Sequence, residues 1–232
     1  MKNSLFTLFL LVIFTNTEAQ TTALINWQQQ YGVSPNNEFS GKVVVDSSNN
    51  VFEVGIYNMG SAFQRTIRIL KYSSGGTLLA SKSISMNASL VRSVVVDNSN
   101  NLYLVVDSIA NNVTYVYKLS NNLNLVLWSK RYTNVIGVKA VVLNTSLFVL
   151  FVGNPGNNSF ANVSKLSTST GAQLSDYLSS NLFPKRIPAD MAIKGTSILL
   201  CGSQYDTNGN RGFVTKLSSL NLSQTWDALS NI

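Results

Sequence analysis

The stretch KVVVDSSNNVFEVGIYN (Lys42 to Asn58) returns fifty residues later as RSVVVDNSNNLYLVVDS (Arg92 to Ser108). Each copy holds an apolar run, a short polar turn and a second apolar run. Apolar runs rich in β-branched residues on either side of such a turn predict a β-hairpin. Weaker copies follow as KAVVLNTSLFVLFVGN over 139–154 and DMAIKGTSILLCGSQ over 190–204. The chain therefore repeats one hairpin four times.

A third and a fourth strand are expected after each hairpin. The third strands end in RILKYSS, YVYKLSN, NVSKLST and FVTKLSS, which align four lysines 47, 47 and 51 residues apart: Lys71, Lys118, Lys165 and Lys216. The fourth strands are LLASKSIS, LVLWSKRYT, AQLSDYLSS and SQTWDALSN, with aligned positions at Ala80, Trp128, Ser175 and Trp226. Units of four short strands that stack to hide their apolar faces are the blades of a β-propeller.

We therefore expect an all-β, β-propeller-like fold of four four-stranded antiparallel blades. The repeats cover approximately residues 40–85, 91–133, 137–180 and 188–231. A β-sandwich with a coincidental similarity between hairpins is the alternative.

The first repeat also resembles a known family. Its two hairpins, VVVDSSNNVFEVG and ILKYSSGGTLLASKS, are similar to the SBBP-type β-propeller repeat, in which AVDSSGNVYVTG is followed by KYDSSGNLLWSK. The resemblance spans essentially the mature chain and is strongest over 40–133. In the last two repeats Leu143 and Lys194 stand where the first two have Asp46 and Asp97. The resemblance implies a scaffold of extracellular and surface proteins that has no shared set of catalytic residues.

The N-terminus predicts secretion. Lys2 precedes an apolar core over 5–14 and a polar exit that ends at Ala19. This order is typical of a cleavable signal peptide, which we place at 1–19, and the apolar core is shorter than a membrane span needs. An uncleaved membrane anchor is the alternative. We expect an extracellular propeller domain over 20–232 and no membrane span.

Sequons for N-glycosylation are frequent, and in a chain secreted by a eukaryotic host they become candidate glycan sites. They begin at Asn87, Asn112, Asn144, Asn157, Asn162 and Asn221.

The sequence contains few of the residues and motifs that catalysis needs. The chain has no histidine, which removes the serine-type triad and the usual zinc sites. A glycosidase would need a carboxylate pair, and no pair stands out among the candidates Glu53, Asp107, Asp176, Asp190 and Asp227. The lone Cys201 lies in an apolar run, so we expect a buried, inert thiol, with an intermolecular bridge as the alternative. We predict neither an enzyme nor a cofactor.

The net charge of +7 arises from 17 scattered basic and 10 acidic residues. In a secreted chain it favours a basic solvated surface, or weak attraction to acidic glycans, over nucleic-acid binding.

Three polar features have two interpretations each. Asp46 and Asp97 are expected to cap hairpin turns rather than to bind calcium. The segment DTNGNRG over 206–212 is expected to form a hairpin turn, again with calcium as the alternative. The aligned lysines are expected to lay their stems over the sheet with the charge at the blade surface, rather than to form an anion-binding ring. We expect no metal site.

The three tryptophans, Trp27, Trp128 and Trp226, share the fourth-strand position. This favours packing between blades over sugar stacking. Trp27 belongs to LINWQQQYG over 24–32, which has the fourth-strand pattern but precedes the first repeat. Trp27 lies 19 residues before Asp46, compared with 17 from Ala80 to Asp97 and 19 from Ser175 to Lys194. Four blades need four such strands, so this fifth one is surplus.

The surplus strand has three possible roles. It completes the chain's own last blade, or the chain is an arc of a larger ring, or the strand completes a blade in a neighbouring molecule. Its candidate assembly residues are Leu24, Ile25, Trp27 and Tyr31.

The function expected from these observations is that of a secreted, N-glycosylated structural scaffold that self-assembles by strand complementation. The alternatives are a propeller module that binds glycans or extracellular proteins and, third, a glycoside hydrolase.

Overall fold

The computed structural model describes residues 27–29, 38–58, 65–86, 88–108, 113–153, 159–179, 185–207 and 209–230. These residues form sixteen strands and no helix, so nothing in the described part of the chain is a helix able to cross a membrane. The strands make four antiparallel sheets of four strands each, which confirms the expected architecture.

Each sheet uses four consecutive strands, and we number the sheets as blades in chain order. Blade 1 contains β1 (Glu38–Val45), β2 (Val51–Asn58), β3 (Arg65–Tyr72) and β4 (Leu78–Ser85). Blade 2 contains β5 (Ala88–Val96), β6 (Leu102–Ser108), β7 (Val113–Leu119) and β8 (Val126–Thr133). Blade 3 contains β9 (Val135–Leu143), β10 (Ser146–Gly153), β11 (Phe160–Ser167) and β12 (Gln173–Leu178). Blade 4 contains β13 (Lys185–Lys194), β14 (Ser197–Asp206), β15 (Gly209–Ser218) and β16 (Gln224–Leu229).

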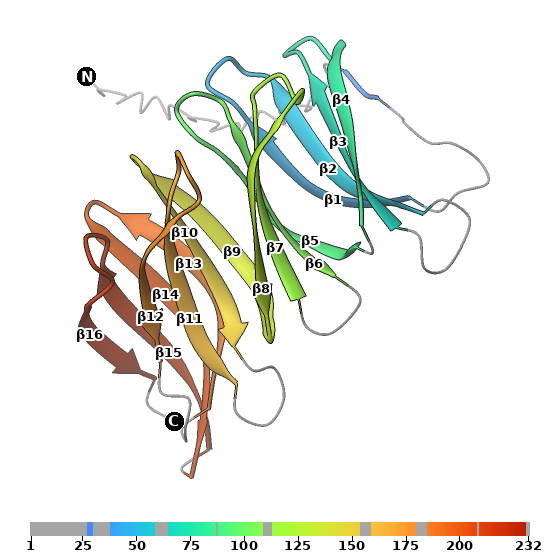
Figure 1. The fold of residues 1–232 in the computed structure, drawn as a ribbon. Helices are drawn as coiled ribbons and strands as arrows, with labels where there is room; N and C mark the ends of the chain where they lie inside the picture. The colour runs from blue at the N-terminus through green and yellow to red at the C-terminus, as the bar shows by residue number, and fades with distance from the viewer. Residues whose placement is uncertain are drawn as a thin grey trace, which may run out of the picture.

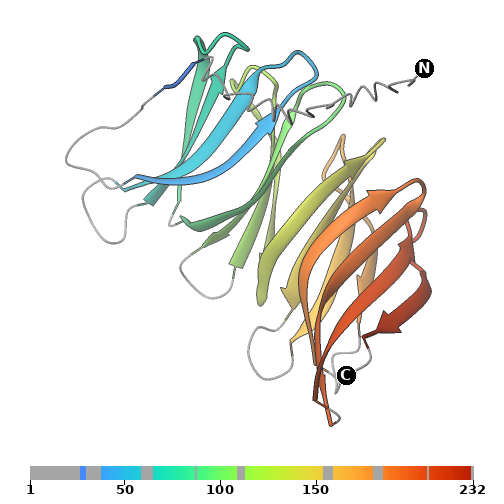
Figure 2. The ribbon, with the colours of Figure 1, turned by 180° about the vertical axis from the view of Figure 1, so that it is seen from behind.

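The blades form a curved row in which each packs on the next. The first strands are innermost, because β1 contacts β5, β5 contacts β9, and β9 contacts β13. The fourth strands lie outermost and are the most exposed. Blades 1 and 4 stand at the two ends of the row (Figures 1 and 2).

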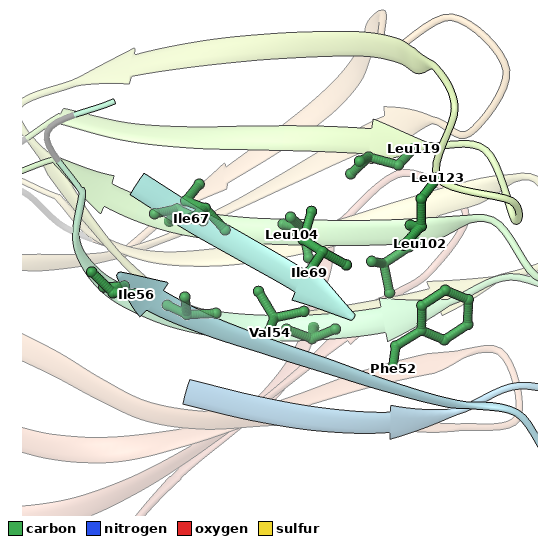
Figure 3. Packing of buried hydrophobic residues seen from close by; sticks show 12 residues of the cluster. Phe52, Val54, Ile56, Ile67, Ile69, Leu102, Leu104, Leu119 and Leu123 are labelled. Atoms are coloured by element: carbon green, nitrogen blue, oxygen red, sulfur yellow. The ribbon is translucent and has the colours of Figure 1, made fainter. Parts of the chain in front are cut away.

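The core is divided among the three blade interfaces. In β6, Leu102 and Leu104 belong to the cluster shared with blade 1, whereas Tyr103 and Val105 belong to the cluster shared with blade 3. Figure 3 shows the first of these interfaces, where Phe52 and Ile69 of blade 1 meet side chains of blade 2. A strand buries alternate residues on opposite faces. The central strands of the middle blades are therefore apolar on both faces.

The turns between first and second strands confirm the capping role of the aspartates. The Oδ1 atom of Asp46 accepts hydrogen bonds from the backbone N–H groups of Ser48 and Asn50, both at 2.9 Å. Asp97 does the same for Ser99 and Asn101 in blade 2. Each carboxylate therefore holds its hairpin turn closed.

Candidate functional site

A lysine connects each blade to the following one. The ammonium of Lys118, on β7, donates a hydrogen bond of 2.8 Å to the carbonyl of Thr168, in the turn between the third and fourth strands of blade 3. Lys71 reaches Asn121 of blade 2 at 2.9 Å, and Lys165 reaches Leu220 of blade 4 at 2.6 Å. We call this contact the lysine latch.

The latch corrects one expectation. The stems do pack over the sheet, with the Lys118 ammonium 5.2 Å from the ring centroid of Tyr103. The charges of Lys71 and Lys118 are nevertheless buried, because each ammonium reaches a carbonyl of the next blade instead of solvent. These lysines hold blades together, and in the structure they do not form a surface ring.

Two latches also contain an ion pair. Lys71 lies 3.3 Å from Asp46, and Lys118 lies 3.4 Å from Asp97. Burial alone would raise the pKa of Asp97, but hydrogen bonds from Asn101 and Tyr103 and the charge of Lys118 outweigh it and lower the pKa below 3.8. The pKa of Asp46 is lowered in the same way.

A tryptophan accompanies the latch between blades 2 and 3. The indole N–H of Trp128, on β8, donates to the same Thr168 carbonyl at 3.1 Å. Its ring lies against Gly171, whose φ is +71°, and a Cβ atom at that glycine would be 2.8 Å from the ring. The outer-strand tryptophan of blade 2 therefore fits a glycine in the turn of blade 3.

Trp27 makes the same contact with blade 1. Its indole N–H donates to the carbonyl of Ser74 at 2.9 Å, and its ring lies against Gly76, where a Cβ would again be 2.8 Å away. Ser74 follows Lys71 by three residues, as Thr168 follows Lys165. Trp27 thus occupies the place of the outer-strand tryptophan of a blade that would precede blade 1.

This placement refines the prediction of a fifth strand. Trp27, Gln28 and Gln29 are the described residues of the segment 24–32, and they have no strand pairing. An outer strand pairs with the third strand of its own blade, and no such strand lies beside Trp27 among the sixteen. The other assembly candidates, Leu24, Ile25 and Tyr31, lie outside the described residues.

At the two remaining interfaces the outer-strand residue is small and the turn residue is large. The fourth-strand residue of blade 1 is Ala80, and the matching turn residue of blade 2 is Leu123, at φ 62° and 2 % exposed. The pair between blades 3 and 4 is Ser175 and Leu222, the leucine again buried at positive φ. Leu123 belongs to the same core cluster that Ala80 packs against. A small outer-strand residue thus goes with a turn leucine, and a tryptophan goes with a turn glycine.

The outward face of blade 4 has the apolar residues of a blade interface, but none of the described strands packs against it. Val214 is 39 % and Trp226 is 43 % exposed, and Lys216 and Trp226 face each other as cross-strand partners. We call this surface the tail face; it comprises Leu199, Cys201, Val214, Lys216 and Trp226. The equivalent positions of blade 2, in the same order, are Tyr103, Val105, Val116, Lys118 and Trp128.

The matching residues of blade 2 show what the tail face lacks. Val116 is fully buried against blade 3 where Val214 is exposed. The Lys216 ammonium has no hydrogen bond or ion pair with any residue that the structure describes. The tail face therefore presents the valine, lysine and tryptophan of an internal interface without a partner blade among the described residues.

The outward face of blade 1 is open as well. Val43 and Val45, on β1, are 64 % and 51 % exposed, whereas Val94, which matches Val43 in blade 2, is 9 % exposed. The turn between β3 and β4 of the same blade carries Ser74 and Gly76, and we call this turn the head site.

Cys201 is a second correction. Its apolar run predicted burial, but the thiol is exposed. The reason is its position on β14: it matches the buried Val105, but it points outward from the last blade.

The sequons fall on different kinds of structure. Asn144 and Asn221 lie in exposed turns, whereas Asn162 lies within β11, between β10 and β12, with its Oδ1 atom buried. Asn87, Asn112 and Asn157 lie outside the described residues.

The candidate carboxylates are engaged with their own neighbours. Asp107 is buried and accepts hydrogen bonds from Arg92, Thr114 and the Gly137 N–H. The other contacts are Asp176 with Ser164, Asp190 with Lys139, Asp227 with Arg186 and Thr215, and an interaction of Glu53. Within the described ranges, His, Cys, Asp and Glu side chains form no group of three or more that could hold a metal.

Strands β14 and β15 form a hairpin that turns within the DTNGNRG segment, of which Asn208 lies outside the described residues. Asp206 pairs with Gly209 across it, and the Asp206 carboxylate binds Arg211 and Gln204. The turn interpretation is confirmed.

The inner strands of all four blades line a central cavity of about 420 Å³. A neighbouring cavity of about 300 Å³ places Lys42, Arg92 and Lys139 near one another. Arg92 is paired with Asp107, and Lys139 lies 3.4 Å from Asp190. Two of the three basic side chains of this smaller cavity are thereby paired with a carboxylate.

Comparison with solved structures shows the same fold. The chain is similar to a neuraminidase-like protein from A/bat/Guatemala/164/2009, with a TM-score of 0.55 and 13 % identity over 82 % of this chain and 55 % of that one. It is also similar to the β-propeller domain of the Trilobed protease from Pyrococcus furiosus, described as having an open velcro topology (TM-score 0.54, 9 % identity, 84 % and 57 % covered). A third similar structure is the Dos1 propeller (TM-score 0.54, 9 % identity, 82 % and 47 % covered).

At these identities the similarity shows the fold alone, and the chain spans about half the length of those proteins. No family model matches the chain, and no curated protein matches it. The chain is thus a β-propeller module, and its resemblance to the SBBP-type repeat rests on the sequence motifs.

Proposed function

We propose that the protein is a secreted, N-glycosylated structural module whose copies associate end to end through the open faces of blades 1 and 4. The observation that carries this proposal is the tail face. Val214 and Trp226 are exposed there, although their matches in blade 2 lie at a blade interface. Apolar surface of this kind marks a protein–protein contact.

The carboxylates favour a structural role over hydrolysis. A glycosidase needs two carboxyl groups on either side of one bond. Here Asp107 and Asp227 are each bound by an arginine of their own blade and by a threonine, as expected for structural ion pairs.

The smaller cavity between the inner strands is the basis of the second candidate function, the binding of acidic glycans. Lys42, Arg92 and Lys139 approach one another there, but Asp107 and Asp190 pair with two of the three. A glycan array at physiological ionic strength tests this function, with Lys42→Ala as the variant that should reduce any positive signal.

Sedimentation velocity of the chain without residues 1–19 tests the association. We expect the average mass to rise with protein concentration, and the labelling of Cys201 by a maleimide to slow in parallel. Cys201 is well suited as a reporter, because it is the chain's single cysteine and lies on the tail face. A constant monomer mass with unchanged labelling at every concentration would refute the proposal.

A further inference from the structure

We infer that the tail face of one copy docks on the head site of a second copy, with Trp226 in the place now held by Trp27. Trp27 is then a removable cap on the head site, and its release controls association. This inference rests on the proposed end-to-end association and adds its partner surface and its control.

The paired residues at the blade interfaces are complementary in size. Along the chain, each turn residue is matched to the outer-strand residue of the blade before it. The pairs are Trp27 with Gly76, Ala80 with Leu123, Trp128 with Gly171, and Ser175 with Leu222. By this alternation Trp226, the last outer-strand residue, fits a turn glycine. The head site offers one in Gly76.

The tail face and the head site also carry the donors and the acceptor of a lysine latch. In the interface between blades 2 and 3, Lys118 and Trp128 donate to one carbonyl, that of Thr168. The matching carbonyl of the head site belongs to Ser74, and it accepts the indole N–H of Trp27. The tail face has both donors of such an interface, Lys216 and Trp226, side by side on β15 and β16. The docked pair therefore reproduces a contact that the chain already uses.

Trp27 is held by fewer contacts at the head site than β16 is in blade 4. Trp27 is held by its bond to Ser74, by a 3.1 Å hydrogen bond from Gln29 to the Gly76 carbonyl, and by its ring contact with Tyr72. The strand β16 is instead paired with β15 along its length. It is held further by Asp227, which binds Arg186 and Thr215, and by Ser230, which exchanges hydrogen bonds with Gly212. Trp27 leaves more easily than β16, so the tail face keeps its own outer strand.

The molecule that docks on the head site is a second copy of the chain. The exposure of Val43 at one end and of Val214 at the other shows that these two faces do not cover each other within the molecule. A contact between two different faces of identical chains is head-to-tail, so it repeats until a ring closes or a filament grows.

Substitutions at the cap and at the tail face test the inference, with association measured by sedimentation velocity on the chain without residues 1–19. We expect Trp27→Ala to strengthen association by roughly tenfold, because the competing intramolecular contact is removed. The matched control is Gln28→Ala, because Gln28 is an exposed neighbour without a described contact, and it should leave association unchanged. Trp226→Ala should weaken association by at least as large a factor.

A compensating pair gives a second, independent readout. Gly76→Leu should block docking of the native tail face, and Leu123 shows that leucine is accepted at this turn position at positive φ. Combined with Trp226→Ala, it should restore association, because the new pair matches Ala80 and Leu123. Circular dichroism confirms that each variant is folded.

Two results would overturn the inference, and they differ. If the protein associates but Trp27→Ala weakens association as Trp226→Ala does, Trp27 is a donated strand rather than a cap, and the proposed function stands. If neither the native chain nor Trp27→Ala associates at any concentration, the proposed function fails with it.

Discussion

Trp27 donates its indole N–H to the carbonyl of Ser74, 2.9 Å away, from outside the blade to which that serine belongs. The bond repeats the contact of Trp128 with Thr168, which joins two complete blades. The turn of the first blade therefore presents the carbonyl and the glycine that blade 3 presents to the tryptophan of blade 2.

Removal of a buried lysine latch should destabilise the fold. Lys118→Met keeps most of the stem but leaves Asp97, whose side chain is 11 % exposed, without its cation. We expect a loss of roughly 3 kcal/mol in the free energy of unfolding, measured by urea denaturation. The control is Lys216→Met, which should change stability by less than about 0.5 kcal/mol because that ammonium contacts no described partner. Equal effects of the two substitutions would argue against the latch.

The fit of Trp128 to Gly171 should be measurable against a matched glycine. Gly195 also has a positive φ, +58°, but a Cβ there meets nothing within 4 Å. Gly195→Ala should therefore lower stability only by backbone strain, about 1 kcal/mol. Gly171→Ala should lower it by roughly 1–3 kcal/mol more, because the Cβ overlaps the indole ring. Thermal and urea unfolding of both variants decide this, and similar losses would contradict the tight contact.

Acid should weaken the first two blades through their turn aspartates. The folded pKa of Asp97 lies below the ordinary 3.8, so the unfolded chain takes up a proton more readily than the folded one. Its contribution to stability is present above pH 3.8 and is lost as the pH falls toward the folded pKa. Unfolding free energies measured from about pH 6 to about pH 3 should fall less steeply in Asp97→Asn than in the native chain. An unchanged slope would contradict the assignment.

Glycan occupancy should follow the local structure of the sequons. We expect Asn144 and Asn221, in exposed turns, to carry glycans when the chain is secreted from a eukaryotic cell. Asn162 should stay unmodified, because it lies within a central strand and its side-chain oxygen is buried. Peptide mass spectrometry with enzymatic deglycosylation reads each site, and full occupancy at Asn162 would show that modification precedes formation of β11.

The repeat pattern predicted the sheets because it records backbone register directly. Lys71 pairs with Ala80 and Lys118 with Trp128 across neighbouring strands, so the positions aligned by the repeat are cross-strand partners. A shift of register follows the lysine in every blade, although the turn of blade 1 is one residue shorter than the turns of the other three.

The contacts between blades were harder to predict from the sequence than the sheets were. Periodicity assigns a residue to a face, but it does not say whether a neighbouring blade covers that face, so the burial of Cys201 was predicted wrongly. The latch was missed because a lysine on an apolar strand gives no sign of the carbonyl that it reaches. A signal for the tryptophan contact was available, however. Each of Gly76, Leu123, Gly171 and Leu222 complements in size the fourth-strand residue of the preceding unit.

The most direct test of the head-to-tail contact is a mixing experiment with two blocked variants. Gly76→Leu closes the head site and leaves the tail face intact, whereas Lys216→Glu disables the tail face and leaves the head site intact. Sedimentation velocity should show each variant as a monomer alone and their equimolar mixture as a one-to-one heterodimer with no larger species. A mixture that stays monomeric while the native chain associates, or that forms larger species, would contradict the contact between blade 4 of one copy and blade 1 of the next.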